Sequence, residues 1–336
     1  MIRILLLIVL STVLFSCSEV EEEPSLVDPS EFVAVRDYNA EVLKVLKKDS
    51  LRILDIGNSY TDDATAMLDQ VAKACGVDLS TLGIYTAVRQ WGSFKSWVDC
   101  YYDNDTEAYH IRRMCGGLTA AVSIGRFVAG HGEVFRELLQ KNAWDVIILH
   151  QVSAKAPYYN DWFGYGSGGY LNELLSLIKE LQPQALVGFY VVHSYWSGYS
   201  SNKEHSSIAR WQLTVNSLDR LVRDSLCDIV IPYGTAIENL RASSQNNEYD
   251  LTRDGTHLEL GLARYTAACC YYESILAPRY GVSMVGQSFN WDGPKMDSTY
   301  PIVNLVDSTI KMGQKAAALA VADWRHCYNP EVTSVR

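Results

Sequence analysis

The sequence lacks the cysteine patterns of metal sites and disulfide scaffolds. Its eight cysteines include no Cys-x-x-Cys pair and no zinc-ligand spacing. Basic residues are also few, with 29 Lys and Arg against 39 Asp and Glu and a net charge of −10. A chain with this acidic balance repels anionic polymers. We therefore expect no metal, no cofactor, no disulfide scaffold and no nucleic-acid partner.

Long hydrophobic runs are absent apart from the N-terminus. Residues 1–16, MIRILLLIVLSTVLFS, combine Arg3 with an apolar stretch too short to span a bilayer, which is typical of a cleaved signal peptide. The segment LFSC then ends at Cys17 and resembles a bacterial lipobox. The alternative is a simple secretory signal followed by an incidental cysteine. Removal of the signal leaves 28 basic against 39 acidic residues, a net charge of −11.

The lipobox resemblance implies that Cys17 carries lipid and becomes the new N-terminus. Because Ser18 follows instead of Asp, the resemblance also implies a lipoprotein of the outer membrane or cell surface of a Gram-negative bacterium. Residues 17–48 include the acidic tract SEVEEEPSLVDPSE and are predicted to be a lipidated tether and lead-in. No internal repeat interrupts residues 49–336, which are long enough for one folded domain.

Apolar, β-rich runs alternate with amphipathic runs along this domain. The expected strands are residues 51–57, 79–88, 144–153, 185–196 and 227–237. Helical spacing separates most of them, as in residues 62–75, where one face carries Ala64, Met67, Leu68, Val71 and Ala72. This alternation predicts an α/β fold, a three-layer α/β/α sandwich around a central, mostly parallel five-stranded sheet. The functional site of such a sheet lies at the carboxyl ends of the strands.

Ser59 follows the first expected strand, in the segment ILDIGNSYTDDATAM. A serine at such a turn is often a helix cap, but we expect the helix to begin near Thr61, with Thr61, Asp62 and Asp63 supplying the capping groups. Ser59 is then available as a nucleophile. The helix N-terminus would offer backbone N–H groups to an oxyanion that forms on its substrate.

A second candidate group lies in LTRDGTHLELG, where Asp254 and His257 stand three residues apart. Catalysis by serine needs an imidazole that takes the hydroxyl proton and a carboxylate that fixes the imidazole tautomer. The alternative for this segment alone is Asp254 as a helix cap and His257 as a surface histidine. The presence of both segments in an α/β order favours a triad of Ser59, His257 and Asp254. His150 and His193 also fall at strand ends, where a histidine is more often structural.

These segments, GNSYT and DGTHLE, together with Gly92 in RQWGSF and Gln151 in DVIILHQVS, resemble the SGNH (GDSL-like) hydrolase superfamily. They are most similar to its domain-of-unknown-function branch, which is common in Bacteroidetes lipoproteins. The resemblance covers roughly residues 50–280 and implies a flavodoxin-like fold and an oxyanion hole of Ser59, Gly92 and Gln151. The family's G-x-N-D block has no literal counterpart, so Gln151 either donates its amide or orders its loop. Asn58 replaces the aspartate of the GDSL signature.

Three segments beyond the expected strand ends, residues 97–110, 158–170 and 193–205, are rich in aromatic residues. Tyr and Trp flanked by Asn, Asp, Ser and Gly suit a stacked, hydrogen-bonded sugar ring, whereas a lipid tunnel would be more aliphatic. The alternative is that about half of these rings are buried under the loops. The candidate substrate-binding residues are Trp91, Tyr158, Trp162, Tyr195 and Trp196.

Together the sequence predicts a carbohydrate esterase that removes O-acyl groups, foremost O-acetyl, through a Ser-His-Asp triad and an acyl-enzyme. Its partner is an acylated carbohydrate substrate, and it contacts the membrane only through the lipid anchor; no oligomeric state is indicated. Two alternatives remain: a lipase or thioesterase with the same fold, and a lipid-anchored glycan-binding protein without catalysis.

Overall fold

The computed structural model describes residues 40–102, 109–120, 127–128, 132–163, 170–200, 205–293 and 295–332. The predicted signal peptide, Cys17 and most of the predicted tether lie outside the described residues. Helix α2 (Ala40–Leu46) falls in the predicted lead-in and buries Val42 and Leu46 in the core. Within the described ranges, no helix has the length and hydropathy needed to cross a bilayer.

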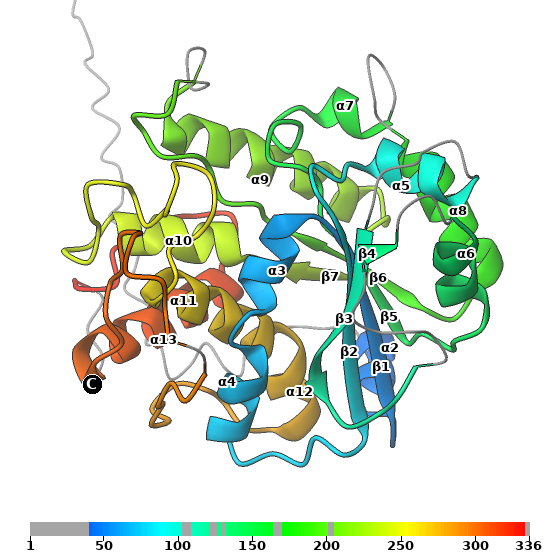
Figure 1. Ribbon diagram of the computed structural model, residues 1–336, viewed down its shortest axis with the longest axis horizontal. Helices are drawn as coiled ribbons and strands as arrows, with labels where there is room; N and C mark the ends of the chain where they lie inside the picture. The colour runs from blue at the N-terminus through cyan, green and yellow to red at the C-terminus, as the bar shows by residue number, and fades with distance from the viewer. Residues whose placement is uncertain are drawn as a thin grey trace, which may run out of the picture.

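A seven-stranded sheet forms the centre of the fold, in the order β4-β3-β2-β1-β5-β6-β7 (Figure 1). Five of its strands are mutually parallel and correspond to the five predicted strands. They are β1 (Leu51–Gly57), β2 (Leu82–Arg89), β5 (Val146–Leu149), β6 (Leu186–Tyr190) and β7 (Ile229–Ile231). The prediction of a five-stranded sheet missed β3 (Tyr109–Gly116) and β4 (Phe127–Val128), which extend the β2 edge in antiparallel fashion.

The sequence of strand β3 does not show the pattern expected of a strand. Its two central arginines, Arg112 and Arg113, are adjacent and both exposed, which breaks the alternation expected of a half-buried strand. In the described part of the chain, β4 pairs only with Tyr109 and His110, so most of β3 lies at the sheet edge, where charged side chains are tolerated. The predicted loop over residues 97–110 is thus partly strand, and its start belongs to helix α5 (Phe94–Tyr101).

Helices cover both faces of the sheet and give the three predicted layers (Figure 1). The first core lies under α2, α4 (Leu68–Ala74), α10 (Tyr233–Arg241), α11 (Leu262–Tyr271), α12 (Ala277–Tyr280) and α13 (Asp307–Ala322). The second lies under α5 (Phe94–Tyr101), α6 (Gly132–Gln140), α7 (Tyr159–Phe163), α8 (Leu171–Leu181) and α9 (Ser207–Arg223). Alternate residues of β1 serve the two cores, with Ile53 in the first and Leu54 in the second.

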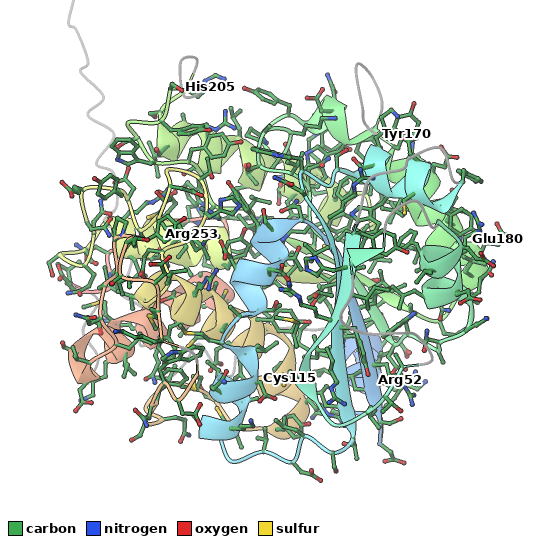
Figure 2. All side chains as sticks on the ribbon, in the orientation of Figure 1. Arg52, Cys115, Tyr170, Glu180, His205 and Arg253 are labelled. Atoms are coloured by element: carbon green, nitrogen blue, oxygen red, sulfur yellow. The ribbon has the colours of Figure 1, made fainter. Side chains whose placement is uncertain are left out.

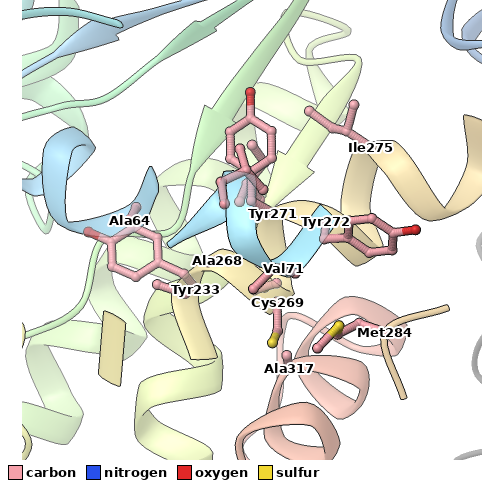
Figure 3. Packing of buried hydrophobic residues seen from close by; sticks show 14 of the residues in the cluster. Ala64, Val71, Tyr233, Ala268, Cys269, Tyr271, Tyr272, Ile275, Met284 and Ala317 are labelled. Carbon is pink, nitrogen blue, oxygen red and sulfur yellow. The ribbon is translucent and has the colours of Figure 1, made fainter. Parts of the chain in front are cut away.

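The predicted helix over residues 62–75 is two short helices, α3 (Ser59–Thr65) and α4, separated at Ala66 and Met67. Its predicted apolar face is confirmed, because all five side chains are buried in the first core. Figure 3 shows Val71 next to Cys269 of α11, within the cluster that also contains Ala64. The two short helices therefore share one buried stripe despite the break between them.

The predicted strand over residues 227–237 is strand only at residues 229–231 and is helix from residue 233 onward. Strand β7 ends at Ile231, and α10 begins at Tyr233 directly after Pro232. Helix α10 is buried from Tyr233 to Leu240, and its polar residues Thr235, Glu238 and Asn239 are buried as well, so it does not present the solvent-exposed polar face that marks a surface helix. Helix α11 continues through a π-helical turn, η1 (Tyr272–Leu276), into α12.

Candidate active site

Ser59 is the first residue of α3 and follows the carboxyl end of β1. The cap of this helix is Asn58, whose Oδ1 accepts the N–H of Tyr60 at 3.0 Å and whose Nδ2 donates to the Gly92 carbonyl at 3.1 Å. The prediction that the helix begins near Thr61 was wrong, because it begins at Ser59 with Asn58 as its cap. Thr61 does take part in capping, since its Oγ1 accepts the N–H of Asn58 at 3.3 Å and completes a capping box. The Ser59 hydroxyl therefore takes no part in capping.

The structure brings the three predicted catalytic residues together. Ser59 Oγ lies 2.8 Å from His257 Nε2, across 198 residues of sequence, and His257 Nδ1 lies 2.7 Å from Asp254 Oδ2. Because an ionised carboxylate only accepts hydrogen bonds, His257 Nδ1 carries the proton and Nε2 accepts the serine hydroxyl. Both residues stay within reach of solvent, with 23% of the His257 side chain and 40% of the Asp254 side chain exposed.

Asp254 is held in its ionised form. Partial burial raises its pKa, but hydrogen bonds from the ring and backbone of His257 and from Thr256 outweigh burial, and the net pKa lies well below the ordinary value. The backbone N–H groups of His257 and Thr256 donate to Oδ1 at 2.8 and 3.0 Å. Asp254 therefore remains an acceptor for His257 Nδ1 throughout the neutral pH range.

A pocket of about 260 Å³ opens over Ser59 and His257. Its walls come from the segments that follow β1, β2 and β5, where the sheet order reverses, and from the loop before α11. The described lining includes Tyr60, Asp62, Gln90, Trp91, His110 and Ser153. The site thus lies at a topological switch point, where open α/β sheets commonly bind their ligands.

Gly92, a predicted oxyanion donor, has its N–H committed elsewhere. It donates to the Arg89 carbonyl at 3.1 Å and closes the turn of residues 89–92. A Cβ at Gly92 would lie 2.7 Å from the Gly57 carbonyl, so the glycine allows close packing of two strand ends. In this structure the oxyanion role predicted for Gly92 is therefore not supported by the geometry.

The other two predicted donors differ in their surroundings. As the first residue of α3, Ser59 has a backbone N–H without an acceptor inside the helix. Gln151 is 1% exposed, and its Oε1 accepts the N–H of Val152 at 3.0 Å. Its Nε2 has no acceptor among the described residues, which is an unusual state for a buried amide.

Of the five predicted substrate-binding aromatics, Trp91 lines the pocket and is 61% exposed. The prediction was wrong for Trp162 and Tyr195, which are 1% and 4% exposed and belong to the second core. Trp162 is the buried residue of helix α7, and Tyr195 lies in the segment between β6 and α9; burial of such large apolar rings stabilises the packing of both segments. Tyr158 and Trp196 are half-buried and do not line the pocket.

Asp63, predicted as a capping residue, joins the two halves of the site. It is 1% exposed, and the Arg253 guanidinium donates to both its oxygens at 3.0 and 2.9 Å. The N–H of Leu258 donates to Oδ2 at 3.1 Å, and Arg264 Nε donates to Oδ1 at 3.0 Å. Arg253 lies next to α3 in the view of Figure 2. One carboxylate on the serine helix therefore holds both flanks of the loop that carries His257.

A second carboxylate–imidazole pair, which the sequence analysis missed, lies on the pocket wall. His110 Nε2 lies 3.0 Å from Asp62 Oδ2, and Arg112 donates to the same oxygen at 3.3 Å. The pair was missed because it depends on β3, which brings His110 and Arg112 beside the serine helix. It places a partly neutralised negative charge near Ser59.

The described residues show no cluster of His, Cys, Asp or Glu arranged to hold a metal ion. The seven cysteines from Cys75 to Cys327 are all free thiols.

No curated protein matches the chain. A crystal structure of a DUF4886 family protein from Bacteroides uniformis ATCC 8492 is similar in fold, with a TM-score of 0.66 and 21% identity over 86% of this chain and 100% of that one. A putative GDSL-like lipase from Parabacteroides merdae ATCC 43184 is more distant, with a TM-score of 0.43 and 14% identity over 68% and 96% of the two chains. An acetyl xylan esterase, AlAXEase, has a TM-score of 0.37 and 16% identity over 65% and 96%.

The model of the family described as Domain of unknown function (DUF4886) matches residues 52–293. This range begins in β1 and extends past α12, so it contains both the serine helix and the loop of His257. The chain accordingly belongs to the DUF4886 family.

Proposed function

We propose that this protein is a serine esterase that removes O-acyl groups, foremost acetyl groups, from carbohydrate. The observation that carries the proposal is the hydrogen-bonded series of Ser59, His257 and Asp254 at the mouth of a pocket. Such a series activates a serine hydroxyl whatever the fold that presents it. A structural role alone would not require the serine and the histidine to meet in an accessible pocket.

In the acylation half-reaction, Ser59 Oγ attacks the ester carbonyl carbon while His257 Nε2 takes the hydroxyl proton. The Asp254 carboxylate stabilises the imidazolium that forms and keeps Nδ1 protonated. His257 then gives the proton to the departing sugar oxygen as the carbon–oxygen bond breaks. The products of this half-reaction are an acyl-serine and a free sugar hydroxyl.

In the deacylation half-reaction, His257 takes a proton from water, and the hydroxide attacks the acyl carbon. The Ser59 oxygen leaves with the proton from His257, and a carboxylic acid is released. The backbone N–H of Ser59, at the positive end of α3, is our proposed donor to the oxyanion. The unpartnered amide of Gln151 is our second proposed donor, if the oxyanion draws it toward the pocket.

Two features of the pocket support a short acyl group on a sugar. A volume of about 260 Å³ is below the range of about 300–1,000 Å³ that is usual for drug-sized ligands, which favours a small acyl group. The exposed indole of Trp91 at the rim supplies an apolar face of the kind on which sugar rings stack. The Asp62 carboxylate on the wall favours neutral over anionic esters.

Acid release from acetylated glycans tests the proposal. Wild-type protein and the Ser59→Ala variant are incubated with acetylated xylan and with a series of esters of increasing acyl length, and the released acids are quantified. We expect acetate release by the wild type only, with activity falling steeply beyond about four acyl carbons. Preference for long acyl chains would favour the lipase alternative. Glycan binding without hydrolysis of any ester would favour the non-catalytic alternative.

A substitution at Trp91 tests recognition of the carbohydrate separately from the chemical step of ester hydrolysis. It stands third in the turn of residues 89–92 with a φ of 55°, a position where Gly or Asn is usual and where a bulky residue costs on the order of 1 kcal/mol. In Trp91→Gly we expect KM for an acetylated oligosaccharide to rise roughly 10-fold through loss of stacking. The free energy of unfolding should stay unchanged or rise by up to about 1 kcal/mol.

Tyr300→Ala is the matched control, because Tyr300 is 43% exposed and does not line the pocket. It should leave KM unchanged. Michaelis–Menten kinetics on the oligosaccharide and on methyl acetate, together with urea unfolding, measure these effects. Equal KM values for Trp91→Gly and wild type on the oligosaccharide would remove Trp91 from the recognition surface.

We also propose that the protein is an outer-membrane or cell-surface lipoprotein, on the basis of the sequence around Cys17, which lies outside the described residues. Cys17→Ala should release the protein into soluble fractions or leave the precursor unprocessed, because the thiol that would carry the lipid is gone. Membrane fractionation and intact-mass analysis measure this. The same membrane partitioning in the variant and the wild type would reject the anchor.

A further inference from the structure

A chain of hydrogen bonds runs beneath the pocket from the serine helix to the loop of the catalytic histidine. Thr61 Oγ1 lies 2.9 Å from His150 Nδ1, and His150 Nε2 lies 3.0 Å from the hydroxyl of Tyr233. The same hydroxyl lies 3.2 Å from His193 Nδ1, and His193 Nε2 lies 2.7 Å from the carbonyl of Thr256. All five residues are buried, with the two histidines at most 1% exposed.

The chemistry of the last acceptor fixes the direction of the whole chain. A carbonyl only accepts, so His193 Nε2 carries a proton and donates to Thr256. In neutral His193, Nδ1 must then accept from the Tyr233 hydroxyl. Having given its only proton, Tyr233 accepts from His150 Nε2–H, which leaves His150 Nδ1 as an acceptor for the Thr61 hydroxyl. A single arrangement of protons therefore satisfies every member.

Both histidines are neutral in this arrangement. Burial lowers the pKa of His150 to about 3, and burial together with the charge of Arg241 lowers the pKa of His193 well below its ordinary value. A protonated imidazole would present two N–H groups, and one of them would face another donor. Because a low dielectric strengthens satisfied hydrogen bonds and penalises unsatisfied ones, the chain has a preferred and rigid geometry.

The two ends of the chain are attached to the catalytic groups. Thr61 lies two residues after Ser59 in α3, and its Oγ1 accepts the N–H of Asn58 at 3.3 Å. At the other end, Thr256 immediately precedes His257, and its hydroxyl donates to Asp254 Oδ1 at 2.9 Å. A change in the hydrogen-bond distances along this series would therefore move the turn of Ser59 relative to the loop that carries His257.

Tyr60 packs over the middle of the chain. Its ring stacks on His193 with centroids 4.6 Å apart and meets the His257 ring edge-on at 5.2 Å. Since Tyr60 is the residue next to Ser59 and lines the pocket, the chain also sets the position of a pocket wall. The contact gives the buried histidines a second, independent connection to the site.

We propose that His150, Tyr233 and His193 are positioning residues, which hold Ser59 and His257 at the separation that proton transfer requires. This inference rests on the proposed esterase function, and it adds three residues that do not touch the substrate. Positioning of this kind acts on turnover, because misplacement of a catalytic group by about 1 Å can cost roughly 100-fold in rate.

Tyr233→Phe is the most direct test, since it deletes one oxygen and keeps the ring. We expect kcat for a small acetyl ester to fall roughly 10- to 100-fold with KM changed less than twofold. The matched control is Tyr272→Phe, which removes a hydroxyl that donates to the Val282 carbonyl at 3.0 Å elsewhere in the first core. Figure 3 shows the Tyr233 and Tyr272 hydroxyls pointing in different directions. The control should lose stability and keep kcat.

Variants at His193 supply a rescue experiment. In His193→Gln, the amide can accept from Tyr233 and donate to the Thr256 carbonyl, whereas His193→Met can do neither at similar size. We expect the glutamine variant to retain more kcat than the methionine variant at matched free energy of unfolding. A kcat for Tyr233→Phe equal to that of the wild type, or an equal fall in Tyr272→Phe, would overturn the proposal.

Crystal structures of the wild type and Tyr233→Phe keep this test separate from the esterase proposal. If the wild type hydrolyses no ester, the proposed function fails, but the distance from Ser59 Oγ to His257 Nε2 still tests positioning. We expect that distance to lengthen beyond hydrogen-bond range, about 3.2 Å, in Tyr233→Phe. An unchanged distance would contradict the inference whatever the activity.

Discussion

Replacement of Ser59 by alanine should lower kcat/KM for a small acetyl ester by roughly 10⁵-fold or more, because it deletes the atom that attacks the carbonyl. The free energy of unfolding should change by less than about 0.5 kcal/mol, since Asn58 and not Ser59 caps α3. Kinetics over a wide range of enzyme concentration, with urea unfolding of the same preparations, measure both quantities.

The comparison variants for this experiment differ in what they remove. Ser176→Ala removes an exposed hydroxyl that donates to the Asn172 carbonyl on α8 and should keep full activity. Asp254→Asn should cost less than Ser59→Ala, roughly 10³- to 10⁴-fold, because it disturbs the tautomer and charge of His257 and leaves the attacking oxygen in place. Hydrolysis by Ser59→Ala at the wild-type rate would end the triad proposal and return Ser59 to the role of a turn residue.

Replacement of Asp63 by asparagine should have the largest effect on stability. The variant leaves two guanidinium groups, from Arg253 and Arg264, facing a neutral amide in a buried position. We expect a loss of about 3 kcal/mol, the lower end for breaking a buried ion pair, because the two arginine side chains retain 16% and 25% exposure. kcat should fall as well, since the loop of His257 loses its attachment to α3.

Asp69→Asn is the control for removal of a carboxylate charge. Asp69 pairs with Lys73 on the surface of α4, and such exposed pairs contribute at most about 1 kcal/mol. Urea unfolding and kcat for the acetyl ester are measured for both variants. If Asp63→Asn were no less stable than Asp69→Asn, the carboxylate would not be the link between the two halves of the site.

The sequence predicted the part of the fold that repeats a simple pattern. The parallel strands are short apolar runs between amphipathic helices, so their positions could be predicted. The location of Ser59 at the carboxyl ends of these strands followed from their positions. Strand β3 could not be predicted, because Arg112 and Arg113 stand side by side at a sheet edge. The first five residues of helix α10 were taken as strand, because the helix is buried almost all around its axis.

For the candidate active site, the types of residue present were a better guide than the local sequence around each of them. The proximity of Ser59, His257 and Asp254 could be predicted, since a serine nucleophile needs an imidazole base and a carboxylate, and the two segments that supply these groups follow strands of one parallel sheet. The burial of Trp162 and the turn bond of Gly92 could not, because both depend on how loops pack after the sheet forms. The sequence around Asp63 did not indicate that this residue forms buried ion pairs, because its arginine partners lie about two hundred residues further along the chain.

The link made by Asp63 also determines when the site can form during synthesis of the chain. Its partners Arg253 and Arg264 follow it by 190 and 201 residues. A nascent chain that does not yet include Arg253 has an Asp63 side chain whose burial is unfavourable, and it has Ser59 without its base, His257. The arrangement of Ser59, His257 and Asp254 is therefore absent from every nascent chain that ends before His257. It forms only when the last third of the chain closes on α3.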